Sequence, residues 1–222
     1  GDLSDWPEGL KVYPLTRRGA GNPPQDGDDF SGSFRLGHDL KRGKLYVAVE
    51  VVDESTFIDT VSDAWDASDG CEIYFDDYLP HGKKAPSQPL QHVIYGRARP
   101  VPQGSDERAV RRTGTKHVYE WAINLKGRGL GDVVGFDIAV LDRDTDGSFT
   151  WTSWGPETVK AQSRDRVGDV KLVEDAEHAV IDWRIMATQP LVLHTNRLRT
   201  ALDYLGSPLS DHTKALMDSA AN

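Results

Sequence analysis

Carboxylates occupy alternate positions in the segment Asp142-Arg143-Asp144-Thr145-Asp146. Oxygen ligands spaced in this way can converge on a hard cation such as calcium. A helix–loop–helix calcium loop needs a glutamate at its twelfth position, and that position is Ser153 here, so this type of loop is excluded. The segment is therefore either an acidic hairpin turn or a calcium site with Asp142, Asp144 and Asp146 as its ligands.

Tryptophans stand in two segments where a ring could meet a ligand. Trp65 begins the acidic segment Trp65-Asp66-Ala67-Ser68-Asp69-Gly70, a poor place for a core residue, so it either faces a ligand or anchors its loop. Trp151 and Trp154 are an odd number of residues apart, which on a regular strand directs them to opposite faces. A flat aromatic ring beside hydrogen-bonding groups suits the apolar face and hydroxyl rim of a sugar.

The charge balance limits the classes of partner. The 222 residues include 35 acidic and 26 basic ones, for a formal net charge of −9. Such a chain repels a phosphate backbone and offers little to an anionic membrane surface, so nucleic-acid binding and direct membrane insertion are disfavoured. The single cysteine, Cys71, has no internal partner and is expected to be a buried strand residue.

Alternating polarity predicts an all-β domain. Runs of β-branched and aromatic residues recur between clusters of Gly, Pro, Asn and Asp, as in two packed antiparallel sheets. The predicted strands cover residues 33–36, 44–53, 71–76, 92–95, 109–112, 117–124, 133–142, 149–154 and 169–173.

The pattern changes after Val173. Apolar residues follow Pro190 at helical spacing up to Gly206, and a second short helix is plausible over 209–220. We therefore expect a β-sandwich at 1–173 and an α-helical C-terminal extension at 174–222. The extension could pack on the sandwich, pair with a second copy in a homodimer, or connect to another domain.

Three segments in this order resemble family 9 carbohydrate-binding modules and the wider group of DOMON-like sandwiches. They are Asp2 to Trp6 followed by the strand 45–53, then Trp65 to Asp76, and then Gly135-Phe136-Asp137-Ile138-Ala139-Val140 through Trp154-Gly155 to Gly168-Asp169-Val170-Lys171-Leu172. The resemblance covers roughly residues 2–173. It implies a two-sheet antiparallel sandwich of jelly-roll or immunoglobulin-like type.

The same resemblance implies a non-catalytic module that binds a saccharide outside the cytoplasm, either appended to a larger enzyme or as a sensor domain. In the family, two tryptophans enclose a sugar ring, and the resemblance places them at Trp65 and Trp154. Neighbouring polar groups would be Glu72 and Asp69, with His92 or Arg97 standing where the family has an arginine. Structural calcium is also implied.

Three alternatives stay open. A haem-binding sandwich would use methionine with histidine or lysine as axial ligands, and both methionines, Met186 and Met217, lie outside the predicted strands. A glycosidase needs two carboxyl groups across a cleft, whereas Glu72 and Asp76 would be about 13 Å apart along one strand. A purely structural or oligomerising domain is the third.

Overall fold

The computed structural model of the protein describes residues 1–59, 61–62, 64–76, 89–96, 106–125, 127–156, 158, 160–162, 166–174 and 181–182. The contacts divide the chain into two units, Gly1–Trp183 and Arg184–Asn222, and all described residues belong to the first. In the described part, no helix is long and apolar enough to cross a membrane.

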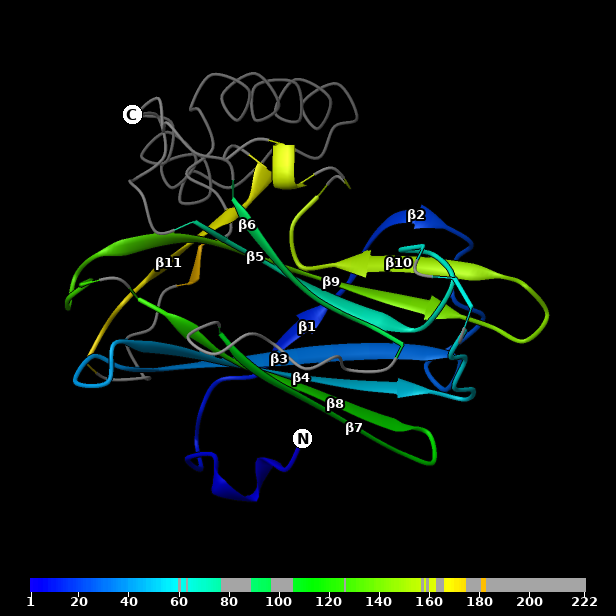
Figure 1. The fold of residues 1–222 in the computed structure, drawn as a ribbon, viewed down its shortest axis with the longest axis horizontal. Helices are drawn as coiled ribbons and strands as arrows, with labels where there is room; N and C mark the ends of the chain where they lie inside the picture. Colours follow the sequence, from blue (N-terminus) through cyan, green and yellow to red (C-terminus); the bar gives the residue numbers. More distant parts are fainter. Residues whose placement is uncertain are drawn as a thin grey trace, which may run out of the picture. The chain divides into compact units, whose positions relative to one another are not determined.

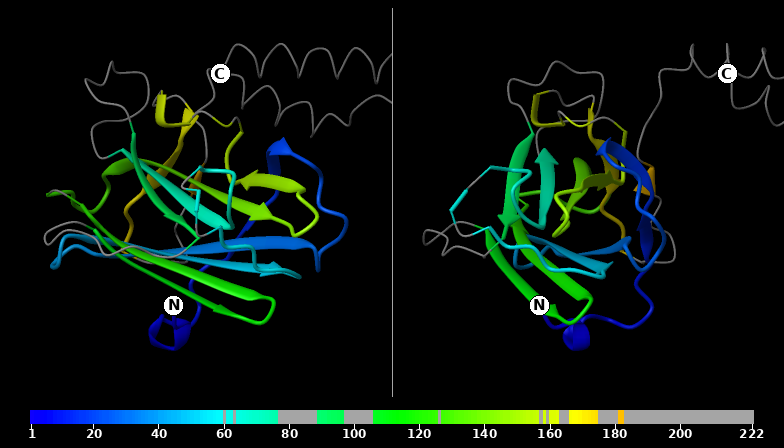
Figure 2. Two further views of the ribbon diagram at one scale, coloured as in Figure 1. Left: turned by 45° about the vertical axis from the view of Figure 1, so that its right-hand side comes forward. Right: turned by 90° about the vertical axis from the view of Figure 1, so that its right-hand side faces the viewer.

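Two antiparallel sheets make up this unit, and Figures 1 and 2 show them stacked face to face. The first, sheet A, has the strand order β1-β3-β4-β8-β7. Its strands are β1 (Tyr13–Leu15), β3 (Phe30–Asp39), β4 (Lys44–Asp53), β8 (Lys116–Asn124) and β7 (Glu107–Thr113).

The second sheet, sheet B, is organised around one long strand, β9. Its strands are β12 (Ile181–Asp182), β11 (Gly168–Lys171), β9 (Val133–Arg143), β10 (Phe149–Ser153), β2 (Arg17–Gly21), β5 (Gly70–Asp76) and β6 (Leu90–Tyr95). One edge of β9 pairs with β5, which in turn pairs with β6. Its other edge is shared by β11 near its start and β10 near its end. Two 3₁₀ turns, η1 (Leu3–Asp5) and η2 (Lys160–Gln162), complete the described elements.

The core lies between the sheets because alternate residues of each strand point inward. The inward residues of the two central strands are Leu45, Val47, Val49 and Val51 in β4, and Val134, Phe136, Ile138 and Val140 in β9. The intervening residues of β9 lie on the side of sheet B that faces away from sheet A, called here the outer face.

The predicted sandwich is confirmed, and each of the nine predicted strands coincides with an observed one. Cys71 is fully buried in β5. The structure adds β1, β2 and β12. Strand β12 corrects the start of the predicted helical extension, because it lies within the range 174–222. Its residues Ile181 and Asp182 pair with Val170 and Asp169 of β11. The rest of that extension, including both predicted helices and both methionines, lies outside the described residues.

Candidate functional site

Aromatic residues gather on the outer face of sheet B. The alternation of β5 puts Cys71, Ile73 and Phe75 in the core, so Glu72 and Tyr74 point outward. The register adds Tyr95 of the neighbouring strand β6, which pairs with Gly70 of β5. The outer-face cluster contains Tyr74, Tyr95, Ala139, Leu141, Phe149, Trp151 and Val167.

Trp65 extends this cluster to the surface. Its side chain is 47% exposed, and its ring meets Phe149 edge to face with 5.2 Å between centroids. The loop that carries Trp65 is fixed on its C-terminal side, since Ser68 Oγ accepts the backbone N–H of Asp59 at 2.7 Å. Trp65 is therefore an exposed aromatic side chain on a hydrogen-bonded loop. Its assignment as a ligand contact stays a prediction.

The second predicted tryptophan, Trp154, does not join Trp65. It is partly buried and packs against the core from the inner side of sheet B, with its ring centroid 5.7 Å from that of Phe34 and 6.3 Å from that of Phe136. Trp151 takes the outer face instead, because it pairs with Leu141, whose neighbour Val140 points into the core. The expectation of opposite faces is confirmed, and the assignment of Trp154 to the outward side is wrong.

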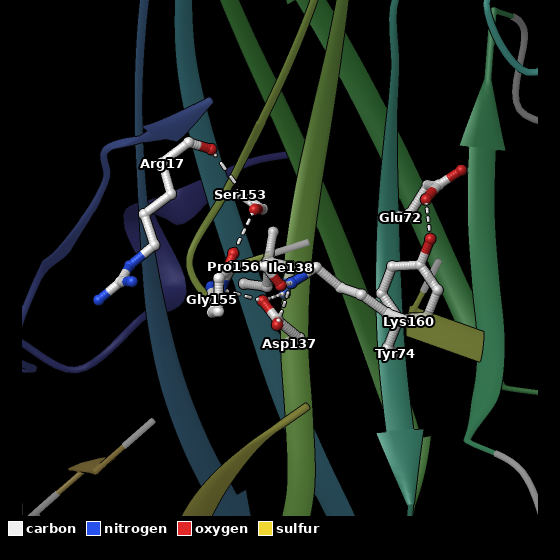
Figure 3. Close-up of polar contacts among 9 residues, drawn as sticks. All are labelled: Arg17, Glu72, Tyr74, Asp137, Ile138, Ser153, Gly155, Pro156 and Lys160. Carbon is white, nitrogen blue, oxygen red and sulfur yellow. Dashed lines mark hydrogen bonds and ion pairs between the residues drawn. The ribbon is translucent and has the colours of Figure 1, made fainter. Parts of the chain in front are cut away.

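A buried ion pair between Lys160 and Asp137 supports the outer-face cluster, and Figure 3 shows its hydrogen bonds. Lys160 is fully buried, and its Nζ donates to Asp137 Oδ2 at 2.5 Å and to the carbonyl of Pro156 at 2.9 Å. The same ammonium lies 5.7 Å from the centroid of the Trp151 ring. Asp137 also accepts the backbone N–H of Gly155 at 3.0 Å, so the segment after β10 is tied to β9.

Glu72 lies at the cluster but is not open to solvent. It is buried, and its two carboxylate oxygens accept the hydroxyls of Tyr74 and Tyr95. Burial, together with the charge of Glu72, raises the pKa of both tyrosines far above the usual range, so both remain donors. The predicted acceptor of sugar hydroxyls is therefore an internal acceptor that orients two aromatic rings.

The remaining predicted polar ligands are elsewhere. His92 pairs with Ile73, which places it on the opposite face of the sheet from Glu72, and its Nδ1 lies 3.0 Å from Asp106 Oδ2. Asp69 is buried and accepts the backbone N–H groups of Phe57 and Arg143. Arg97 lies outside the described residues.

A cluster of acidic side chains lies where several strands begin or end. Asp53 ends β4, Asp142 lies near the end of β9, and Asp69 directly precedes β5. Ligand atoms lie within 4.8 Å of one another in three overlapping groups, which are Asp29 with Asp142 and Asp144, Asp53 with Glu54 and Asp144, and Asp53 with Asp69 and His117. These residues are called the acidic cluster below.

The crowding of carboxylates shifts their protonation. Burial, and then the charges of Asp53 and Asp144, raises the pKa of Asp142 to about 9. Burial, and then the charge of Asp69, raises the pKa of Asp53 to about 7, and burial raises that of Asp69 to about 6. Burial lowers the pKa of His117 to about 4, so this imidazole is neutral and does not balance the acids.

The acidic cluster fits a hard divalent cation. Asp142 is 1% exposed, and neither of its carboxylate oxygens has a hydrogen-bond partner within the described part of the chain. Several carboxylates around such an orphaned pair of oxygens form the donor set that calcium takes. Of the three predicted ligands, Asp142 and Asp144 belong to the cluster. Asp146 does not, because it is exposed and accepts the backbone N–H of Ser148 at 2.7 Å.

Sequence reasoning missed Asp29 and Asp53 of the acidic cluster, and Phe149 and Tyr95 of the aromatic one. Phe149 had a signal, since it is two residues from Trp151 on one strand and so shares its face. Asp53 also had a signal in the sequence, because it is the charged residue that ends a mostly apolar strand. Asp29 and Tyr95 depend on pairing between distant segments.

Comparisons with known proteins agree with the fold. Two solved structures of a family 9 carbohydrate-binding module from Caldicellulosiruptor kristjanssonii share the fold at 17% sequence identity and a TM-score of 0.62. The complex with cellotriose covers 83% of this chain and 93% of that one, and the complex with glucose covers 78% and 88%. A search of curated proteins finds no significant match. The family model described as carbohydrate family 9 binding domain-like matches residues 5–175, and the chain therefore belongs to this family.

Proposed function

We propose that this chain is a non-catalytic carbohydrate-binding module whose saccharide stacks on Trp65. The observation that carries the proposal is the ring of Trp65, 47% exposed and supported edge-on by Phe149. A sugar ring presents an apolar C–H face that such a surface can cover, while hydroxyls at its rim stay hydrated or hydrogen-bonded. The similar modules are described in complex with cellotriose and with glucose, which supports the same class of ligand here.

The state of Glu72 supports binding without turnover. A general acid or base must have an oxygen free to exchange a proton with the substrate. Both oxygens of Glu72 are engaged by tyrosine hydroxyls, and the carboxyl is 3% exposed. The carboxylate of Glu72 is therefore suited to positioning aromatic rings and not to cleaving a glycosidic bond.

The test is isothermal titration calorimetry with glucose, cellotriose and xylotriose against wild type, Trp65→Ala and Leu130→Ala. Leu130 is the matched control, since it is an apolar loop residue of similar exposure, 53%. We expect Trp65→Ala to weaken binding at least about tenfold, or about 1.4 kcal/mol, because a central aromatic contact is lost. Equal affinities for wild type and Trp65→Ala would place the ligand elsewhere.

We include a structural calcium ion in the proposal, held by Asp142 and Asp144 with Asp29 and Asp53. The orphaned oxygens of Asp142 and the raised carboxyl pKa values support it, because both describe a site that lacks positive charge. Calcium supplies that charge and accepts six to eight oxygen ligands.

We also propose that the module acts outside the cytoplasm, appended to a larger enzyme or as a sensor domain. Polysaccharides are too large to enter a cell intact, so a module that recognises them is useful where they occur. Protease protection in cells that express the full-length protein checks this location. A protein outside the cytoplasm should be digested by added protease once the outer compartments are opened. If it stays intact, the proposed location is wrong.

A further inference from the structure

A cavity lies at the far end of β4 from the acidic cluster. Its volume is about 480 Å³, within the roughly 300–1,000 Å³ of ligand pockets. Leu45 and Tyr46 line it near the start of β4, whereas Asp53 of the acidic cluster ends the same strand. At about 3.3 Å per residue, the cavity and the acidic cluster are more than 20 Å apart. We call this space the end cavity.

Aromatic rings form part of the wall of the end cavity, and at least one is held firmly. Trp6, Tyr13 and Tyr46 line it. Trp6 donates from Nε1 to Glu120 Oε1 at 2.7 Å, and the other oxygen of Glu120 accepts the backbone N–H of Asp2 at 3.0 Å. The N-terminal segment is thereby anchored on β8. The indole of Trp6 is fixed before any ligand arrives, which lowers the entropy cost of binding.

The polar groups of the end cavity are balanced in charge. Three carboxylates line it, Asp5, Asp39 and Glu174, together with three cationic side chains, Lys11, Arg42 and Lys171. His38 also lines it, with its Nε2 2.7 Å from the carbonyl oxygen of Val173. An anionic ligand such as a phosphate ester would find no excess of positive charge, and a fatty acyl chain would leave these groups without hydrogen bonds. A neutral ligand with an apolar face and many hydroxyls matches both the rings and the mixed charges.

One of these polar groups, Asp39, is held by the backbone, and the exposed side chain of Arg42 lies next to it. Asp39 Oδ1 accepts the backbone N–H groups of Lys41 and Arg42 at 2.9 and 3.0 Å, which fixes the β3–β4 turn. Arg42 Nε lies 3.6 Å from Asp39 Oδ2. A carboxylate and a guanidinium side by side can accept from and donate to neighbouring hydroxyls of one ring.

Gly37 keeps the end cavity open. It lies in β3 and lines the cavity, and a Cβ added there would meet only Leu10 Cδ1, at 3.9 Å. A side chain at this position would therefore enter free space without a clash. This makes Gly37 a position at which the cavity can be filled while its walls stay intact.

We propose that the end cavity is a second saccharide-binding site, separate from Trp65 and formed by Trp6, Tyr46, Asp39 and Arg42. The inference rests on the proposed function for the class of ligand, but on different residues for the site. Two separated sites on one module would let it hold a polysaccharide at two points or bridge two chains, with avidity above that of either site.

The test follows the indole N–H signals of Trp6 and Trp65 by NMR in the full chain, titrated with glucose, cellotriose and xylotriose. Both signals are assigned from Trp→Phe variants. In Trp65→Ala we expect the Trp6 signal still to shift and saturate. In Gly37→Val the apparent Kd of the Trp6 shift should rise at least tenfold, with the Trp65 titration and the melting temperature unchanged.

The outcomes separate the two proposals. A Trp65 signal that titrates while Trp6 stays unmoved overturns the second site and leaves the proposed function standing. A Trp6 shift that disappears in Trp65→Ala also overturns it, because the shift then reports binding at Trp65. Titration of Trp6 alone removes Trp65 as the ligand site and keeps the end cavity. No shift of either signal with any of the three sugars overturns both.

Discussion

Replacing Asp142 by asparagine tests the acidic cluster most directly. In the metal-free protein the folded-state pKa of Asp142 is about 9, whereas its ordinary value is 3.8. Between these two values the folded protein keeps a proton that the unfolded chain releases. Stability that is fully present below pH 3.8 is therefore lost as pH rises toward 9.

The size of this loss follows from linkage. One retained proton changes the free energy of unfolding by about 1.4 kcal/mol per pH unit, so three units from pH 5 to pH 8 cost on the order of 4 kcal/mol. For a protein of this size that corresponds to a fall of about 8–16 °C in melting temperature. Asp53, with a pKa of about 7, adds to the loss in the lower part of this range.

Calcium should reverse the trend, because it requires ionised ligands and stabilises the folded state as they ionise. The assay is differential scanning fluorimetry from pH 5 to pH 8, in EDTA and in saturating calcium, with wild type, Asp142→Asn and Asp146→Asn. In EDTA we expect Asp142→Asn to lose most of the pH slope and to melt above wild type at pH 8. It should also lose the stabilisation by calcium, while Asp146→Asn keeps the wild-type response.

Two results would refute this reasoning. One is a wild-type melting temperature in EDTA that does not fall between pH 5 and pH 8, since the carboxylates would then not be held protonated by burial. The other is a calcium response of Asp142→Asn equal to that of wild type. An unchanged response would mean that the orphaned oxygens of Asp142 are not ligands.

Two further substitutions test the support of the outer-face cluster. Lys160→Met leaves the carboxylate of Asp137 buried without its ammonium, so urea unfolding should show a loss of about 3–5 kcal/mol, and a loss below about 1 kcal/mol would contradict the role of the pair. Tyr95→Phe removes one of the two hydroxyls on Glu72 and should cost about 1–3 kcal/mol in the same assay. No loss in Tyr95→Phe would show that Glu72 does not depend on this hydroxyl.

The strands could be predicted where their own residues carry the signal. The alternation of β4 and β9 was sufficient to place both in the core of the sandwich. By contrast, β2 has the sequence Arg-Arg-Gly-Ala-Gly and no strand-forming residue. It is a strand because it pairs with β10, where Gly19 lies so close to Trp151 that a Cβ would come within 2.5 Å of the indole. Such pairing is not visible in a local pattern.

The tryptophans show the limit of face parity. An odd spacing correctly separated Trp151 from Trp154, but parity does not say which face is the core. The register of β10 against β9 decides it, because Trp151 lies opposite Leu141 on the outer face. The exposure of Trp65 was accessible from its polar surroundings, whereas its contact with Phe149 joins segments 84 residues apart.

The acidic residues likewise show that spacing along the chain does not reveal which side chains meet in space. Regular spacing identified Asp142 and Asp144, which are neighbours on the β9–β10 hairpin. It also selected Asp146, which the turn carries out to solvent. Asp29 directly precedes β3 and Asp53 ends β4, and they meet the hairpin only because β3 begins where β4 ends.

Asp69 connects the acidic cluster to the aromatic site. Its two oxygens accept the backbone N–H of Phe57, in the loop that leads to Trp65, and that of Arg143, at the start of the hairpin that leads to Phe149. One buried carboxylate thus holds the backbone of both segments that lead to the aromatic contact. Ordering a free backbone on binding costs about 1–2 kcal/mol per residue, so a ligand that stacks on Trp65 benefits from a loop already held in place. The polar residue that sequence reasoning assigned to the sugar is therefore positioned to serve it indirectly, by holding the backbone that presents the ring.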